Sequence, residues 1–364
     1  MTDAAASSLL WEGRSREEQF LLRTLRSFVL QGDGREAPEQ PPGLQWDRVA
    51  QLVHVNNIGP VVHHCFREHP LPLRDHGRWG QVRMKQLVDN LRTLRVAVRL
   101  FRLFEDAGIR SVGLRGVTLA HLHYPDAGLR PMKDLDLLVD ARDHGQVIEA
   151  LRRDGLEPSN RLRSQVVYVI DGIEVEVHLS LLTAKRYRAV FDRDALLAAR
   201  TGAKTAEGAV FRLTREDELL ELVAHAFVHH ELQGLGRMLD IALVMTRPGL
   251  EWDRIVRWCE ASRLTNMVLF TLAFTDSLFG LDLRPEERFG RKLPFWSHAM
   301  FRSYLKLYFG GDNPMDYLCR MRSLLYAAER PVTKMNQLFR FFSKRYAKDL
   351  RYLLRKDKAP HITA

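Results

Sequence analysis

The stretch LRGVTLAHLHYPDAGLRPMKDLDLLVD, residues 114–140, combines short apolar runs with glycine, proline and charged residues in a fixed order. The run at 109–114 that leads into it is short and partly β-branched, which is typical of a strand. VTLAHLHY then has helix length, and PDAGLRPMK has loop composition before the apolar run at 135–139. The order strand, turn, helix, loop, strand predicts an α/β unit at the centre of the chain.

Two carboxylates stand on the second of these predicted strands. Asp134 and Asp136 are two residues apart, so the alternation of a strand points both side chains to one face and the intervening leucine to the other. Like charges this close are unfavourable unless a cation neutralises them, and hard oxygen ligands beside a phosphate-bearing substrate favour Mg²⁺ or Mn²⁺. The pair therefore predicts a divalent-cation site.

A third acid is expected from a hairpin about forty residues later. In QVVYVIDGIEVEVHLSL, residues 165–181, an Asp-Gly pair between two alternating runs predicts a type I′ turn. Glu174, Glu176 and His178 then share one face of the second hairpin strand. Either glutamate could complete the acidic site, and His178 could orient the acid or be a structural histidine. Three converging acids could hold two metal ions, one activating a hydroxyl and one neutralising a departing pyrophosphate.

A phosphate site is predicted upstream of the acids. The Arg115-Gly116 turn joins a strand to a helix, which leaves backbone N–H groups free near Gly116 and Thr118. Arg115, with Arg130 and Lys133 from the following loop, could add positive charge around the β- and γ-phosphates of a nucleotide.

Helical patterns flank this unit on both sides. The sequence predicts an α+β fold in which a small mixed-sheet core at 99–200 lies between an N-terminal helical region, 1–98, and a C-terminal helical domain, 201–364. A helical layer packed on the sheet would leave a cleft for substrate.

Composition narrows the class of protein. The 364 residues are 46% hydrophobic, enough for a large core, and no uninterrupted apolar run is long enough for a transmembrane span. No secretion signal is visible, and the odd number of scattered cysteines argues against disulfides and zinc fingers, so we expect a cytoplasmic protein with reduced thiols at Cys65, Cys259 and Cys319. The net charge of +10 favours anionic partners.

Two weaker patterns lie in the C-terminal half. Glu221, His225 and His229 have helical spacing; they could ligate zinc, but we favour a helix face near the substrate, with Asp240 of the next helix capping or pairing. Residues 331–358 carry nine Lys and Arg interleaved with aromatics. This segment could contact nucleic acid or an anionic membrane surface, or be a helix with solvated cations.

The run at 114–140, followed by GIEVEVHLSL at 172–181, resembles the uncharacterised bacterial nucleotidyltransferase family of the polymerase β-like superfamily. Members of that family show a Lys-Gly turn, an R-P-x-x-D-(I/L)-D-L-L-V strand and a later E-L-H strand, and the resemblance covers about residues 100–245. It implies that Asp134 and Asp136 are metal ligands, Glu176 the third acid, Gly116 the glycine that phosphate approaches and Arg130 a nucleotide-side cation. This chain has arginine at position 115 where the family usually has lysine.

The expected activity is metal-dependent transfer of a nucleotidyl group from a nucleoside triphosphate, such as ATP, to an acceptor hydroxyl, with Mg²⁺ or Mn²⁺ in a two-metal mechanism. RNA, a partner protein or peptide, and a small molecule all remain open as acceptors. The alternative is a non-catalytic RNA-binding or regulatory protein that retains the fold. Asp136→Ala is expected to abolish turnover and to change stability little, because it relieves like-charge repulsion.

Overall fold

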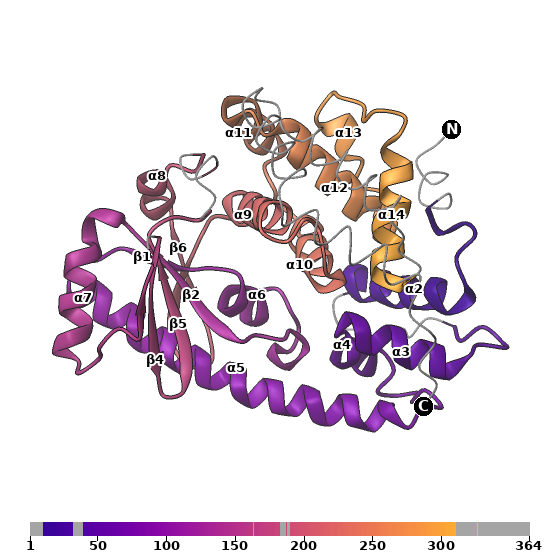
Figure 1. The fold of residues 1–364 in the computed structure, drawn as a ribbon, viewed down its shortest axis with the longest axis horizontal. Helices are drawn as coiled ribbons and strands as arrows, with labels where there is room; N and C mark the ends of the chain where they lie inside the picture. Colours follow the sequence, from indigo (N-terminus) through magenta and orange to yellow (C-terminus); the bar gives the residue numbers. More distant parts are fainter. Residues whose placement is uncertain are drawn as a thin grey trace, which may run out of the picture.

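The computed structural model describes residues 10–31, 39–162, 164–182, 187, 190–310 and 326. Helices dominate both ends of the described chain and strands the middle (Figure 1). The N-terminal helices are α2 (Arg16–Gln31), α3 (Trp46–Asn56), α4 (Gly59–Cys65) and α5 (Asp75–Asp106). The central elements are β1 (Ser111–Gly113), α6 (Gly116–Leu122), η1 (Ala127–Leu129), β2 (Asp134–Val139), η2 (Ala141–Asp143), α7 (His144–Arg153), β3 (Asn160–Arg161), β4 (Gln165–Ile170), β5 (Ile173–His178) and α8 (Arg193–Ala198). Then follow β6 (Thr201–Lys204), β7 (Ala209–Arg212), α9 (Arg215–Val228), α10 (Leu235–Met245), α11 (Trp252–Ser262), α12 (Thr265–Phe279), α13 (Pro285–Arg288) and α14 (Ser297–Phe309).

The predicted α+β fold is confirmed, with a mixed sheet in the order β3-β4-β5-β2-β1-β7-β6. The predicted order from β1 to β2 is present, and the β4–β5 hairpin turns at Asp171 and Gly172, which both have the positive φ that a type I′ turn requires. Strands β6 and β7 were not expected. They extend the sheet beyond residue 200, because β7 pairs in parallel with β1 and β6 pairs antiparallel with β7.

One face of the sheet is apolar and covered by helices. Leu135 and Leu137 of β2 and Val175 and Val177 of β5 belong to one buried cluster with residues of α5 and α7. In Figure 1 these two helices flank the sheet, and α5 runs on from it to α3 and α4. Burial of this apolar face fixes the register, since a shift by one residue would turn every side chain over. The opposite face is therefore left for the acids.

The N-terminal and C-terminal helices share a core. Buried side chains of α2, α3 and α4 belong to the same apolar cluster as those of α9 to α14. Figure 1 shows these helices grouped beside the sheet, with α9 and α10 nearest to it. The division into three regions at residues 98 and 200 stays a prediction, and the helical layer that it places against the sheet is assembled from both ends of the chain.

In the described part of the chain, no helix combines the length and apolar character needed to span a membrane. Cys65 and Cys259 are free thiols buried in the helical core, and burial raises the pKa of Cys65 to about 12. Cys319 and the basic segment 331–358 lie outside the described residues, so the predicted contact of that segment with an anionic surface stays a prediction.

Candidate active site

Register brings the predicted acids together on the uncovered face of the sheet. Strands β2 and β5 are parallel neighbours, with Asp134 opposite Glu174 and Asp136 opposite Glu176. Paired residues of adjacent strands point to the same face, so all four carboxylates lie on one side. Glu174 is exposed and outside the cleft described below, whereas Glu176 lines it. Of the two glutamates, only Glu176 therefore faces the space between sheet and helices.

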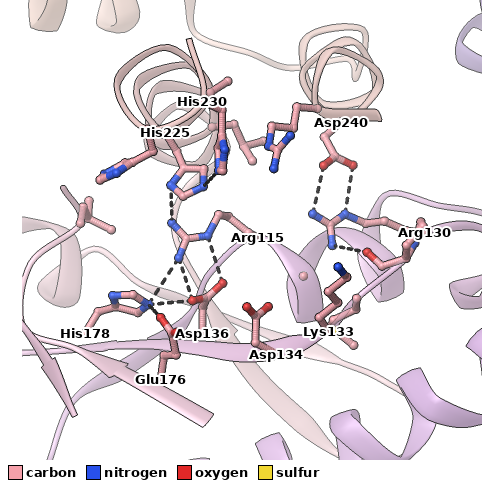
Figure 2. A pocket seen from close by; sticks show the side chains of 18 of the residues that line it. Arg115, Arg130, Lys133, Asp134, Asp136, Glu176, His178, His225, His230 and Asp240 are labelled. Atoms are coloured by element: carbon pink, nitrogen blue, oxygen red, sulfur yellow. Dashed lines mark hydrogen bonds and ion pairs between the residues drawn. The ribbon is translucent and has the colours of Figure 1, made fainter. Parts of the chain in front are cut away.

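His178 connects the two acids that stand opposite each other. Its Nε2 lies 2.7 Å from Oδ1 of Asp136 and 3.3 Å from Oε2 of Glu176 (Figure 2). The Glu176 oxygen also accepts a hydrogen bond of 2.8 Å from the side-chain amide of Gln165. Burial by itself would lower the pKa of His178, but the hydrogen bonds to Asp136 and Glu176 outweigh it and raise the pKa. His178 is thus a donor between the two carboxylates.

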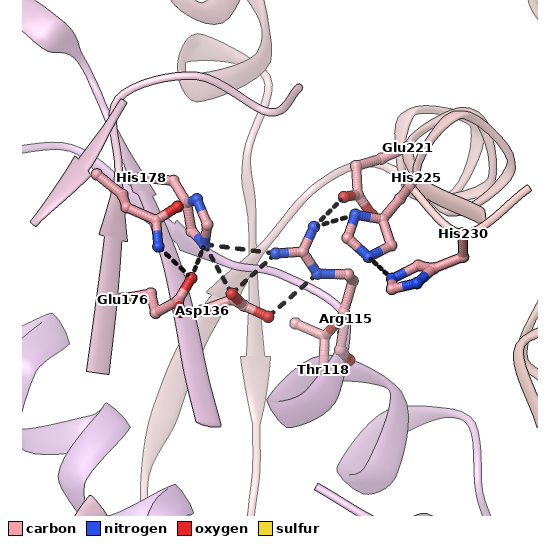
Figure 3. A network of polar contacts seen from close by, with 9 residues as sticks. Arg115, Thr118, Asp136, Glu176, His178, Glu221, His225 and His230 are labelled. Atoms are coloured by element: carbon pink, nitrogen blue, oxygen red, sulfur yellow. Dashed lines mark hydrogen bonds and ion pairs between the residues drawn. The ribbon is translucent and has the colours of Figure 1, made fainter. Parts of the chain in front are cut away.

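Arg115 lies against Asp136. Nη2 is 2.8 Å from Oδ1 of Asp136 and Nε donates to Oδ2 at 3.1 Å, a two-pronged contact that engages both carboxylate oxygens (Figure 3). The side chains are 11% and 10% exposed. Burial by itself would raise the pKa of Asp136, but the Arg115 charge and the His178 hydrogen bond hold it well below its usual range. Asp136 is therefore an anion with a fixed cation beside it.

The far side of Arg115 is held by helix α9. Nη1 donates to Oε1 of Glu221 at 2.9 Å and lies 2.8 Å from Nδ1 of His225. Because a guanidinium can only donate, His225 accepts at Nδ1, and its Nε2 hydrogen points to Nε2 of His230, 3.1 Å away. Both imidazoles are then neutral. Burial holds the pKa of His225 well below its usual value, and burial followed by the nearby Arg237 lowers that of His230 to about 4.

Asp134 is the acid without a cation. Among the described residues its carboxylate has no hydrogen-bond or ion-pair partner (compare Figure 2). Burial, with the negative charges of Asp136 and Glu176 adding to it, raises its pKa. Uncompensated negative charge therefore concentrates at Asp134 and Glu176.

The donor atoms fit a divalent cation. One ligand atom each from Asp136, Glu176 and His178 lie within 4.8 Å of one another, and Asp134 is close enough for its pKa to be raised by the two acids. Carboxylate oxygens with one imidazole nitrogen suit Mg²⁺ or Mn²⁺. The contacts of Arg115 and His178 with Asp136 already satisfy part of that carboxylate's charge.

A second arginine joins the loop before β2 to helix α10. Nε and Nη2 of Arg130 each donate to one oxygen of Asp240, both at 3.0 Å, and the hydroxyl of Tyr124 donates to the same carboxylate at 2.8 Å (Figure 2). Asp240 therefore pairs, one of the two roles considered for it. In contrast, Lys133 and Arg237 also line the cleft, and neither makes an ion pair among the described residues.

Gly116 and Thr118 lie at the start of α6 but have different surroundings. Gly116 lines the cleft, and a Cβ there would meet Sδ of Met132 at 2.7 Å, so the close approach of the loop requires glycine. Thr118 is buried, its hydroxyl donates to the carbonyl of Arg115 at 3.2 Å, and it is not part of the cleft lining. Of the predicted phosphate-side residues, the structure thus brings Arg115, Gly116, Arg130 and Lys133 into one cleft and leaves Thr118 behind it.

The cleft between the sheet and α9–α10 has a volume of about 590 Å³. Sequence reasoning missed several of its residues. His230 follows the end of α9, and the chain turns there through left-handed residues without a glycine to signal the turn. Arg237 is three residues before Asp240 on α10, a spacing that places both on one helix face and was the only available signal. The further lining residues that were missed are Pro131, Met132, Gln165, Leu181, Leu222 and Ala226.

Comparison with known proteins gives the family. No curated protein matches. Among solved structures, similarity is found to the solution structure of the antibiotic-resistance factor ANT(2'')-Ia (13% identity, 48% of this chain and 92% of that chain, TM-score 0.36). It is also found to ANT(2'')-Ia in complex with adenylyl-2''-tobramycin (12% identity, 47% and 96%, TM-score 0.36). A third is an antigenic nucleotidyltransferase-like protein from Paracoccidioides brasiliensis (16% identity, 56% and 95%, TM-score 0.38). A family model described as uncharacterised nucleotidyltransferase matches residues 42–280, more than half of the chain, and the chain belongs to this nucleotidyltransferase family.

Proposed function

We propose that this protein transfers a nucleotidyl group from a nucleoside triphosphate to an acceptor hydroxyl, with release of pyrophosphate and with dependence on Mg²⁺ or Mn²⁺. One observation carries the proposal. Within a nucleotidyltransferase family match, Asp136 and Glu176 stand in register on adjacent strands, and their oxygens lie with an imidazole nitrogen inside 4.8 Å. Such a group is unfavourable as a mere surface feature and is what a divalent cation requires.

Asp134, Asp136 and Glu176 are the proposed metal-holding acids. A divalent cation bound there would supply charge neutralisation for the triphosphate and lower the pKa of the attacking hydroxyl. Asp134 is the proposed acceptor of the hydroxyl proton. Its carboxylate has no partner among the described residues and its pKa is raised, so it is better suited to take up a proton than Asp136, which Arg115 holds as an anion.

The phosphates are proposed to lie toward Gly116 and Lys133. Lys133 is not engaged by a carboxylate in the described structure, and Gly116 lets the backbone approach closely. Arg130 is proposed to act on this side as well, holding the loop that carries Lys133 against α10 through Asp240. Thr118 is proposed to support the turn through its hydrogen bond to Arg115 rather than to touch the nucleotide.

The acceptor is proposed to enter between the sheet and α9–α10. The cleft volume of about 590 Å³ lies in the range of small-molecule sites. RNA and a side-chain hydroxyl of a partner protein would have to present one hydroxyl into the same space. We place the reaction in the cytoplasm, where triphosphates and Mg²⁺ are available.

The test uses purified protein, each triphosphate labelled at the α-phosphate, and cell extract as the pool of acceptors, with and without Mg²⁺. Magnesium-dependent label in the RNA, protein or small-molecule fraction supports the proposal and identifies the acceptor class. The alternative, a non-catalytic RNA-binding or regulatory protein, is favoured by one observation, the engagement of both Asp136 oxygens by Arg115. Absence of transfer with every triphosphate, together with RNA binding, would establish that alternative.

A further inference from the structure

Arg115 stands in an unusual place for a phosphate-binding side chain. Its backbone has a φ of 47°, in the left-handed region that a non-glycine residue occupies only when the surroundings hold it there. The guanidinium turns to the acids of β2 and to α9, and its contacts connect the two walls of the cleft (Figure 3). What holds Arg115 is therefore its side-chain network.

The network leaves Arg115 no free direction. Asp136 takes Nε and Nη2, and Glu221 with His225 takes Nη1. The Glu221 side chain is 2% exposed. A buried carboxylate needs a paired cation, because desolvation of an unpaired charge is unfavourable by several kcal/mol (about 3–5). Withdrawal of Arg115 would leave both Asp136 and Glu221 unpaired.

The charge balance within the acidic cluster is uneven as a result. Asp136 has a full positive charge within hydrogen-bond distance of both oxygens, and the neutral tautomer of His225 adds none. Asp134 has no partner among the described residues, and Glu176 is contacted by the uncharged amide of Gln165 and shares His178 with Asp136. A further cation is needed at Asp134 and Glu176, not at Asp136.

We propose that Arg115 is a built-in cation that replaces one of two metal ions, so that the chain binds a single divalent cation, held mainly by Asp134 and Glu176. The inference rests on the proposed metal-dependent function and deepens it. Arg115, braced by Glu221 and His225, neutralises Asp136 and positions that carboxylate beside the bound ion. It is a positioning residue, since it acts on the ion through Asp136.

The test is titration of the full chain with Mn²⁺ alone, in the absence of nucleotide, followed by electron paramagnetic resonance or calorimetry. One Mn²⁺ per chain is expected. Asp134→Asn and Glu176→Gln should each weaken its binding at least about ten-fold, the effect of losing a charged ligand worth about 1.4 kcal/mol. Asp136→Asn should weaken it less than about three-fold, because Arg115 already offsets that charge. A loss with Asp136→Asn as large as that with Glu176→Gln would overturn the inference.

Arg115→Met gives a second, opposite signal. Removal of the competing cation should tighten Mn²⁺ binding at least about ten-fold or open a second site, and Asp136→Asn added to it should cancel the gain. The matched control is Arg200→Met, since Arg200 is similarly buried, at 14% exposure, and pairs with Glu105 away from the cleft. Should Arg115→Met not fold, the comparison of the three acid variants still decides.

The outcome separates this inference from the proposed function. Equal Mn²⁺ binding by the wild type and Arg115→Met contradicts the role of Arg115 and leaves the metal site standing. Binding only by Arg115→Met supports the role of Arg115. Absence of binding in both contradicts the inference and the metal-dependent function together.

Discussion

The two walls of the cleft are built by different rules. The sheet wall carries Asp134, Asp136 and Glu176, placed by strand alternation and by the register of β2 with β5. The helical wall carries His225 and Asp240, whose places depend on how α9 and α10 dock (Figure 2). Each wall holds one end of a buried ion pair whose other end belongs to the opposite side of the cleft. The difference teaches that the chemistry is set by local pattern, whereas its electrostatic balance is set by tertiary packing.

Removing Asp136 should have the largest effect, because it belongs to both systems. Asp136→Asn is expected to reduce the rate of nucleotidyl transfer about 1,000-fold, the scale of losing a central electrostatic group. It should also destabilise the fold by about 3–5 kcal/mol, because Arg115 is left buried with one carboxylate fewer. Urea unfolding and a transfer assay measure both. The sequence-based expectation of little change in stability is thus corrected, since Asp136 is paired with a cation. Unchanged stability would restore that expectation and break the comparison.

The two glutamates of β5 offer a matched pair within the sheet wall. Glu176→Gln should lower transfer about 100-fold, whereas Glu174→Gln should remain within about two-fold of the wild type. Both side chains point to the same face, but Glu176 lines the cleft and Glu174 is exposed outside it. Steady-state rates at saturating Mg²⁺ and triphosphate provide the measurement. Equal losses in the two variants would show that strand alternation alone does not select the acid.

The second buried pair tests the helical wall. Asp240→Asn should destabilise the protein by about 3 kcal/mol, because the Arg130 guanidinium loses its only carboxylate in the described structure. It should raise the KM for triphosphate about ten-fold through the loosened loop that carries Lys133. In Arg130→Met/Asp240→Leu, most of the stability should return while the KM stays high. Recovery of both properties would show that this pair is structural only.

The neutral histidines predict a modest pH effect on stability. The pKa of His230 is about 4 in the folded chain and about 6.5 when unfolded. Between these values the unfolded state binds a proton that the folded state excludes, so stability falls as pH falls from 6.5 to 4 and is unaffected above 6.5. Urea midpoints at pH 7 and pH 5 should differ less in His230→Gln than in the wild type. His54→Gln, which removes an exposed histidine, is the control and should behave like the wild type.

Much of the sheet wall could be predicted from the sequence. The Asp-x-Asp strand, the Asp-Gly hairpin and the arrangement of helix α6 follow from alternation and turn chemistry, which are local. The strands β6 and β7 could not, because their short, weakly apolar runs join the sheet only through the parallel pairing of β7 with β1. The contact of Arg115 with Glu221 joins residues 106 positions apart and had no local signal. Spacing placed Glu221 and His225 on one helix face but could not tell which cation would face them.

The central claim is that the acids of β2 and β5 direct transfer from the α-phosphorus of a triphosphate. The most direct measurement compares two labels, with α-labelled and γ-labelled forms of each triphosphate incubated with Mg²⁺, the protein and the acceptor pool. The account predicts that only the α-label joins the acceptor, that the γ-label appears in pyrophosphate, and that Glu176→Gln abolishes transfer while Glu174→Gln preserves it. Transfer of the γ-label to the acceptor, or undiminished α-label transfer by Glu176→Gln, would contradict it.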